Sequence, residues 1–167
     1  MKPNSLILIS FSFLIALPRI HAQWTKISGL EGQFIVTMAV KGDTMFAGGH
    51  RRALFRSTDS GTNWTNVNSM QAETTLALTF DSIYVLSGAD GRGIFRSTNI
   101  GDAWEPIGGL PIQMRYVSGF VSLQGALFAS TRNGIYRSTD HGSTWTISST
   151  GLGTPGTYLN VQRMVTE

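Results

Sequence analysis

The sequence contains no cysteine, and only 14% of its 167 residues are charged. The lack of cysteine excludes disulfides, thiolate metal sites, cysteine nucleophiles and a lipid-modified N-terminal cysteine. Average globular proteins have about 25% charged residues, and the low value here excludes a highly charged disordered chain and a coiled coil. With only three histidines, a three-histidine zinc site would need all of them. We therefore expect no metal and no cofactor.

Glycine and apolar residues, by contrast, are plentiful. The chain has 19 glycines, and 41% of its residues are hydrophobic. This composition favours many short strands joined by tight turns around a buried core. The length suits one ordinary domain, for which about 150 residues is typical.

Residues 1–22 have the pattern of a secretory signal peptide. Lys2 precedes an apolar run of 12 residues, Leu6 to Leu17, and a short polar stretch ends at Ala22. The run is shorter than the roughly 20 residues that span a bilayer. We expect cleavage after Ala22, although Ile20 is unusual three residues before the cut. The alternative is an uncleaved anchor.

Cleavage would make the product secreted or periplasmic, without stable membrane insertion. It would also remove Lys2 and Arg19, which leaves 11 basic and 10 acidic residues. A net charge of +1 gives no reason to expect nucleic acid as a partner.

An internal repeat organises the rest of the chain. Tryptophans stand at 24, 64, 104 and 145, about 40 residues apart. The last three end similar segments, 57–64, 97–104 and 138–145, that read Ser-Thr-Asp/Asn-x-Gly-x-x-Trp. Asp or Asn suits a turn because its side chain accepts backbone hydrogen bonds, and glycine tolerates positive φ. Each segment therefore predicts a hairpin turn, with the tryptophan sealing the hairpin against its neighbours.

Two further strands are predicted before each hairpin. The expected strands are 35–40 and 44–48, then 75–80 and 83–87, then 117–122 and 126–130. Outside the signal peptide, no window shows a helical period. Four short strands in about 40 residues, repeated, are typical of an all-β fold of the β-propeller type.

The repeated segments resemble the Asp-box, or BNR repeat, S-x-D-x-G-x-x-W. Similar repeats occur in sialidases, xyloglucanases, sortilin-type receptors and photosystem II assembly factors. The resemblance implies a structural turn between the third and fourth strands of each blade, away from the functional face. Asn99 replaces the aspartate in the second segment but keeps an acceptor oxygen. The residues implied to be structural are Ser57, Asp59, Gly61, Trp64, Ser97, Asn99, Gly101, Trp104, Ser138, Asp140, Gly142 and Trp145.

The predicted ring is incomplete, with blades at about 30–69, 70–109 and 110–150. Residues 23–27 resemble a lone fourth strand, and residues 158–165 resemble a lone first strand. A closed propeller has at least about four blades. We expect either a fragment of a longer protein or self-association through open blade edges. The outer apolar faces are expected to contain Ile35, Met38, Val40 and Phe46 at one end, and Phe120, Leu127 and Phe128 at the other.

Arginine recurs at 52, 92 and 132, each shortly before a third strand, in loops of the functional face. Three guanidinium groups on one face are suited to a carboxylate, a sulfate or an acidic glycan. We take Arg52, Arg92 and Arg132 as candidate ligand-binding residues. The alternative is that duplication merely repeated solvated turn residues.

A second set, Arg56, Arg96 and Arg137, has one repeated place inside a strand, which favours a structural role. Carboxylates outside the repeated turns are few, and nothing in the sequence brings two of them together as glycoside hydrolysis requires. No catalytic residue is assigned. The sequence thus predicts a secreted, non-catalytic propeller segment that acts as a binding or scaffold surface, with a glycan or a protein as the expected kind of ligand. The alternative is a fragment of a glycoside hydrolase resembling xyloglucanases or sialidases.

Overall fold

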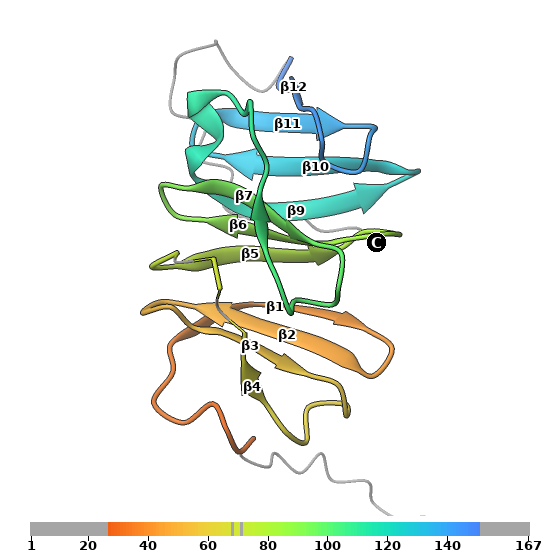
Figure 1. Ribbon diagram of the computed structural model, residues 1–167. Helices are drawn as coiled ribbons and strands as arrows, with labels where there is room; N and C mark the ends of the chain where they lie inside the picture. Colours follow the sequence, from red (N-terminus) through yellow and green to blue (C-terminus); the bar gives the residue numbers. More distant parts are fainter. Residues whose placement is uncertain (1–26, 68, 71, 151–167) are drawn as a thin grey trace, which may run out of the picture.

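The computed structural model describes residues 27–67, 69–70 and 72–150. These residues form three antiparallel four-stranded sheets that follow one another along the chain. In each sheet the strands lie in sequence order, so every connection within a sheet is a hairpin. Figure 1 shows the sheets one above another, in sequence order from orange to blue.

The strand bounds repeat closely from sheet to sheet. The first sheet contains β1 (Ile35–Lys41), β2 (Thr44–Gly49), β3 (Leu54–Ser57) and β4 (Thr65–Asn66). The second contains β5 (Thr75–Phe80), β6 (Val85–Ala89), β7 (Gly93–Ser97) and β8 (Glu105–Pro106). The third contains β9 (Val117–Leu123), β10 (Ala126–Thr131), β11 (Gly134–Ser138) and β12 (Thr146–Ile147).

Five of the six strands expected before the hairpins agree with the structure to within a residue at each end, and one is displaced. The strand expected at 83–87 begins at Val85 and ends at Ala89. Ile83 and Tyr84 belong to the preceding turn, which the Asp81 N–H closes with a 2.8 Å bond to the Tyr84 carbonyl. Two β-branched and aromatic residues in this turn have strand-like propensity, which explains the displaced prediction.

One short 3-10 helix, η1 (Ile112–Arg115), interrupts the link between the second and third sheets. The helical period gave no sign of it because a single turn is too short to show one. Within the described part of the chain, no helix has the length and apolar character needed to cross a membrane.

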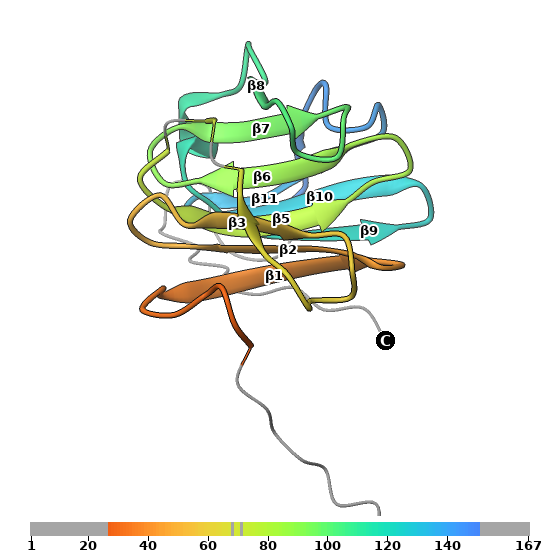
Figure 2. The same cartoon turned by 60° about the horizontal axis from the view of Figure 1, so that its bottom comes forward.

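The core consists of two apolar layers, each between neighbouring sheets. The first layer includes Phe46, Leu54, Leu78, Phe95 and Trp104 from the first two sheets. The second includes Leu86, Ile94, Val117, Tyr136 and Trp145 from the last two sheets. The first strands β1, β5 and β9 contact one another in turn. Figure 2 shows the three sheets overlapping, with β1 lowest and β8 highest in the view.

Two glycines allow this close approach. A Cβ on Gly48 would stand 2.4 Å from the Thr75 side chain, and one on Gly88 would stand 2.8 Å from the Val117 carbonyl oxygen. Gly48 and Gly88 have the same register, opposite Leu54 and Ile94. Each glycine therefore lets the first strand of the next sheet pass against the backbone of β2 or β6.

The outermost faces of the stack remain partly exposed. Val36, Met38 and Val40 of β1 are exposed, as sequence analysis expected for Met38 and Val40. Three residues assigned to outer faces instead pack between sheets. Phe46 lies between the first two sheets, Leu127 lies between the last two, and the partly buried Phe120 packs against the same layer as Leu127. These assignments were wrong because adjacent strand residues point to opposite faces, and a register is needed to choose between them.

Several sequence predictions fall outside the described residues. These are the signal peptide at 1–22, the lone strand at 158–165, and most of the lone strand at 23–27.

Candidate functional site

Three turns, which we call the Ser-Trp turns (57–64, 97–104 and 138–145), share one hydrogen-bond pattern. In the first, the Ser57 hydroxyl donates to Asp59 Oδ1 at 2.7 Å and accepts from the Gly61 N–H at 2.9 Å. Asp59 Oδ1 also accepts the Asn63 N–H at 2.8 Å. Gly61 has a φ of 87°, which favours glycine. The repeated residue types therefore close a local network.

The second Ser-Trp turn forms the same network with an amide. Asn99 Oδ1 accepts from the Ser97 hydroxyl and from the Ala103 N–H, each at 2.9 Å. The Gly101 N–H donates to the Ser97 hydroxyl at 2.8 Å. The turn thus needs the acceptor oxygen at this position, whether or not it is charged.

The aspartates of the other two turns are held in their charged form. Hydrogen bonds, first from the Thr144 hydroxyl and then from the Thr144 N–H, lower the pKa of Asp140 to about 2. The Asn63 N–H and then the Asn63 side-chain amide lower the pKa of Asp59 to about 2 as well. Both carboxylates are used within their turns, which agrees with a structural function.

Arginines of the third strands in the first two sheets donate hydrogen bonds to the Ser-Trp turn of the following sheet. Arg56 Nη1 donates to Asp102 Oδ1 and to the Ile100 carbonyl, both at 2.6 Å. Arg96 Nη1 donates to the Ser143 hydroxyl at 3.3 Å. Asp102 and Ser143 are both the sixth residue of their turns. The repeated arginine therefore acts between sheets, and the third member, Arg137, is exposed.

The opposite end of the sheets, which we call the loop face, consists of the loops between second and third strands and the links between sheets. Arg52 lies here and forms an ion pair with Glu73, with Nη2 2.9 Å and Nε 3.1 Å from Oε1. Glu73 belongs to the link into the second sheet. Both side chains are mostly exposed.

The other two candidate ligand-binding arginines lie on the loop face of later sheets. The Arg132 guanidinium lies 3.7 Å above the ring of Tyr116, a cation–π contact that leaves its charge available. Arg92 is exposed. Within the described residues, no hydrogen bond or ring contact joins Arg92 to Arg132. That Arg52, Arg92 and Arg132 bind one ligand together stays a prediction.

The loop face as a whole has an excess of positive charge. Its arginines are Arg51, Arg52, Arg92, Arg115 and Arg132, and its acidic residues in the described ranges are Glu31, Glu73 and Asp90. Five cations against three anions make the local potential of this end of the described blades positive, because summed charges set that potential.

A hollow of about 520 Å³ lies on this face beside the first sheet, lined by Gly32, Gln33, Phe34, His50 and Arg51. The rings of Phe34 and His50 are 5.1 Å apart, and His50 Nδ1 is 3.3 Å from the Thr74 hydroxyl. Arg51 has a φ of 57° and Arg52 a φ of 62°, so two successive non-glycine residues are left-handed. The sequence gives no sign of this hollow, because the segment at 32–34 and His50 meet only through pairing of the strands.

Several solved structures superpose on this chain, and they indicate its fold. No protein-family model and no curated protein matches the chain. Among solved structures, YCF48 bound to D1 peptide superposes with a TM-score of 0.59 at 19% identity. The match covers 68% of this chain and 40% of YCF48. The GH74 enzyme of Niastella koreensis superposes with a TM-score of 0.55 at 22% identity, over 68% of this chain and 22% of that enzyme.

These neighbours and the three repeated sheets together identify the architecture. The chain has a β-propeller fold. Each sheet is a blade, and the described residues form an open ring. The chain spans less than half the length of YCF48 and less than a quarter of the GH74 enzyme. A computationally designed protein, Ika4, is also similar, with a TM-score of 0.56 at 13% identity over 78% of its length.

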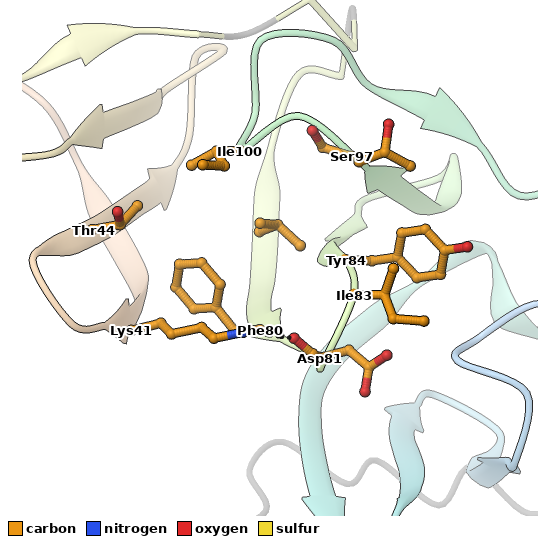
Figure 3. A pocket seen from close by; sticks show the side chains of 10 residues that line it. Lys41, Thr44, Phe80, Asp81, Ile83, Tyr84, Ser97 and Ile100 are labelled. Atoms are coloured by element: carbon orange, nitrogen blue, oxygen red, sulfur yellow. Dashed lines mark hydrogen bonds between the residues drawn. The ribbon is translucent and has the colours of Figure 1, made fainter.

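A second hollow, of about 260 Å³, lies between blades 1 and 2 at the end with the Ser-Trp turns. Figure 3 shows Phe80 and Lys41 on one side of it, with Tyr84 and Ile83 opposite. Lys41 Nζ donates to the Asp81 carbonyl at 3.3 Å and lies 6.0 Å from the centre of the Phe80 ring. Ile83 and Ile100 are exposed at its rim. This hollow follows from the packing of the two blades, and its lining mixes apolar and polar side chains.

Most carboxylates outside the Ser-Trp turns already have partners. Asp43 accepts from the Ser60 hydroxyl at 2.8 Å, and Glu31 accepts from the Gly29 N–H at 2.7 Å. Asp81 lies 2.6 Å from His141 Nδ1. Glu73 pairs with Arg52 as described, and Asp90 and Glu105 are exposed. The four partnered groups hold turns or links in place.

Proposed function

We propose that the chain is part of an Asp-box propeller whose loop face binds an acidic peptide without catalysing a reaction. The carrying observation is the set of five arginines on one end of the three blades, against three acidic residues. Guanidinium groups bind carboxylates in a two-pronged geometry, which suits aspartate and glutamate side chains or a chain terminus.

The arrangement of these arginines supports recognition of an extended ligand. Arg51, Arg92 and Arg132 belong to the loops of three successive blades, so their charges follow the curve of the ring. Arg132 is held over Tyr116, and its conformational freedom is already reduced before binding. The backbone of Arg51 is held in a left-handed conformation beside the hollow at Phe34 and His50. The neighbour YCF48 is bound to a peptide, which favours a peptide over other anions.

The proposal is tested by titrating the purified protein with a penta-glutamate peptide at several salt concentrations. We expect binding that weakens as salt rises, because salt screens exposed charges. Replacing Arg51, Arg92 and Arg132 together by Gln should weaken binding about tenfold, which corresponds to about 1.4 kcal/mol. Lys41→Gln is the control, since it removes a cation from the opposite end of the blades, beside the Ser-Trp turns. Equal affinity of the triple variant and the control would refute the proposal.

A second candidate, a segment of a glycoside hydrolase, is motivated by the GH74 neighbours. The carboxylates that would act as the acid and base of such an enzyme are the exposed Asp90 and Glu105. Asp90 lies on the loop face, and Glu105 lies in β8, opposite Arg96 of β7. Release of reducing sugars from xyloglucan by the protein, lost in Asp90→Asn, would favour this candidate. Peptide binding without hydrolysis would favour the first.

Export is part of the proposal. Cleavage after Ala22 would place the propeller outside the cytoplasm, where a fold without cysteine is unaffected by oxidation. N-terminal sequencing of the protein recovered from the periplasm or medium should begin at Gln23. Recovery of the uncut chain in the cytoplasm alone would contradict export.

A further inference from the structure

The two contacts between blades have the same arrangement, and equivalent residues are present at both ends of the described ring. In each contact, an exit face of one blade packs on an entry face of the next. The exit faces are formed by Phe46 and Leu54 of blade 1 and by Leu86 and Ile94 of blade 2, all fully buried. The matching entry faces are formed by Leu78, Val85, Phe95 and Trp104 of blade 2 and by Phe120, Leu127, Tyr136 and Trp145 of blade 3.

Register identifies the equivalent residues that lack such a neighbour within the described chain. Met45 pairs with Ser57 as Val85 pairs with Ser97, so Met38, Met45, Phe55 and Trp64 form the entry face of blade 1. Phe128 pairs with Arg137 as Leu86 pairs with Arg96, so Phe128 and Ile135 belong to the exit face of blade 3. Met38 is 46% exposed, whereas its equivalent Leu78 is 7% exposed.

The polar contact between blades also has an equivalent donor and an equivalent acceptor at the two ends of the described ring. At both internal contacts, the third-strand arginine reaches the sixth residue of the next Ser-Trp turn, Asp102 or Ser143. Arg137 of blade 3 is the corresponding arginine, and Thr62 of blade 1 is the corresponding sixth residue. Thr62 is exposed and offers a hydroxyl, as Ser143 does.

We propose that the exit face of blade 3 binds the entry face of blade 1 in a second copy of the chain. The described blades of two copies joined in this way at both ends number six, which lies within the usual range of about four to eight for a closed ring. Such a head-to-tail contact closes when the rotation per blade fits, and otherwise it produces open chains. Arg137 of one copy would donate to Thr62 of the other.

One position makes the proposed contact weaker than the internal ones. Ser130 stands opposite Ile135, where Gly48 and Gly88 stand in the other blades. A Cβ at the two glycine positions would lie less than 3 Å from the following blade. Ile35, the equivalent of Thr75 and Val117, would have to pass Ser130. The proposal therefore predicts a dimer that dissociates on dilution.

Sedimentation velocity of the exported, purified chain over a range of concentrations tests the proposal. Wild-type protein should shift from one to two copies as concentration rises. Thr62→Asp should lower the dissociation constant about fivefold, equivalent to about 1 kcal/mol, because it recreates the Arg56–Asp102 pair. Asn133→Asp adds the same charge on the loop face and should leave the equilibrium unchanged.

Charge exchange distinguishes a direct contact from a loss of folding. Arg137→Glu should abolish the dimer, and Arg137→Glu combined with Thr62→Arg should restore it, while circular dichroism stays unchanged throughout. The proposal would be overturned if the wild-type protein and the Thr62→Asp variant both remained monomers at every concentration. So would a dimer that Arg137→Glu leaves intact, or open-ended chains in place of a discrete pair.

Discussion

Trp104 and Trp64 stand at the same place in two Ser-Trp turns, and their surroundings differ. Trp104 is 7% exposed and contacts Phe46 of the preceding blade edge-to-face, with ring centres 5.9 Å apart. Trp64 is only half-buried, and no preceding blade lies within the described residues. Trp64 donates Nε1 to the Gly61 carbonyl at 2.9 Å, as the buried Trp145 does to the Gly142 carbonyl, whereas Trp104 Nε1 has no hydrogen-bond partner among the described residues.

The difference separates two levels of organisation. The turn itself forms in all three repeats, including the first, because its hydrogen bonds connect residues at most four apart. Burial of the tryptophan requires a second blade about 40 residues away. The stability of each repeat therefore depends on its neighbours, as expected for repeated units.

The sharpest test of this comparison replaces each tryptophan by alanine. Trp104→Ala should lower the free energy of unfolding by about 3–5 kcal/mol, because it empties a closed layer between blades. Trp64→Ala should cost about 1 kcal/mol, since much of its surface already contacts water. Urea unfolding followed by circular dichroism measures both. Equal losses would mean that the entry face of blade 1 is covered.

A smaller effect is expected where blades approach most closely. Gly88→Ala should destabilise the protein by about 1–3 kcal/mol, because the new Cβ meets the Val117 carbonyl and side chain. Gly108→Ala is the matched control, since its Cβ would have no atom within 4 Å. Thermal unfolding of the two variants should show a lower midpoint for the first alone.

The two arginine contacts between blades should differ in strength. Arg56, whose side chain is 20% exposed, forms a charge-assisted bond to Asp102, so Arg56→Ala should cost about 1 kcal/mol. Arg96 reaches a neutral hydroxyl at 3.3 Å, and Arg96→Ala should cost about 0.5 kcal/mol. A double-mutant cycle of Arg56 and Asp102 isolates the pair. A coupling energy of zero would remove Arg56 from the contact.

The smallest expected effect concerns acid. Asp59 and Asp140 have a pKa of about 2 in the folded protein against 3.8 normally. A pKa lowered by folding contributes stability that is complete above the unfolded value and is lost as pH falls from about 4 to about 2. Asp140→Asn, which copies the second turn, should flatten the stability profile over that interval. Asn99→Asp should steepen it. Unfolding midpoints measured between pH 2 and pH 5 provide the comparison.

Much of the fold could be predicted because its signals are local. The tryptophan spacing and the turn residues predicted three four-stranded units, and most strand bounds agree with the structure. Which face a strand residue occupies was harder to predict. Phe46 and Leu127 were placed on outer faces because a strand's pattern does not say which of its two faces meets which neighbour.

The candidate site could be predicted only in part. The loop arginines were found by their repeated position, but the ion pair of Arg52 with Glu73 and the stacking of Arg132 on Tyr116 were not. These partners lie 16 to 21 residues away in the chain and come from links between blades. No periodic signal connects them.

The sequence by itself determined the three Ser-Trp turns and the hairpins around them, because short-range hydrogen bonds and glycine conformations suffice to form them. Only the tertiary structure decided which apolar faces are closed and which arginine reaches which turn. Those contacts join residues of different blades, which are 34 positions apart for Phe46 and Phe80 and 46 apart for Arg56 and Asp102. Equivalent residues such as Trp64 and Trp104 therefore differ in burial, since burial depends on the neighbouring blade and not on the turn that contains them.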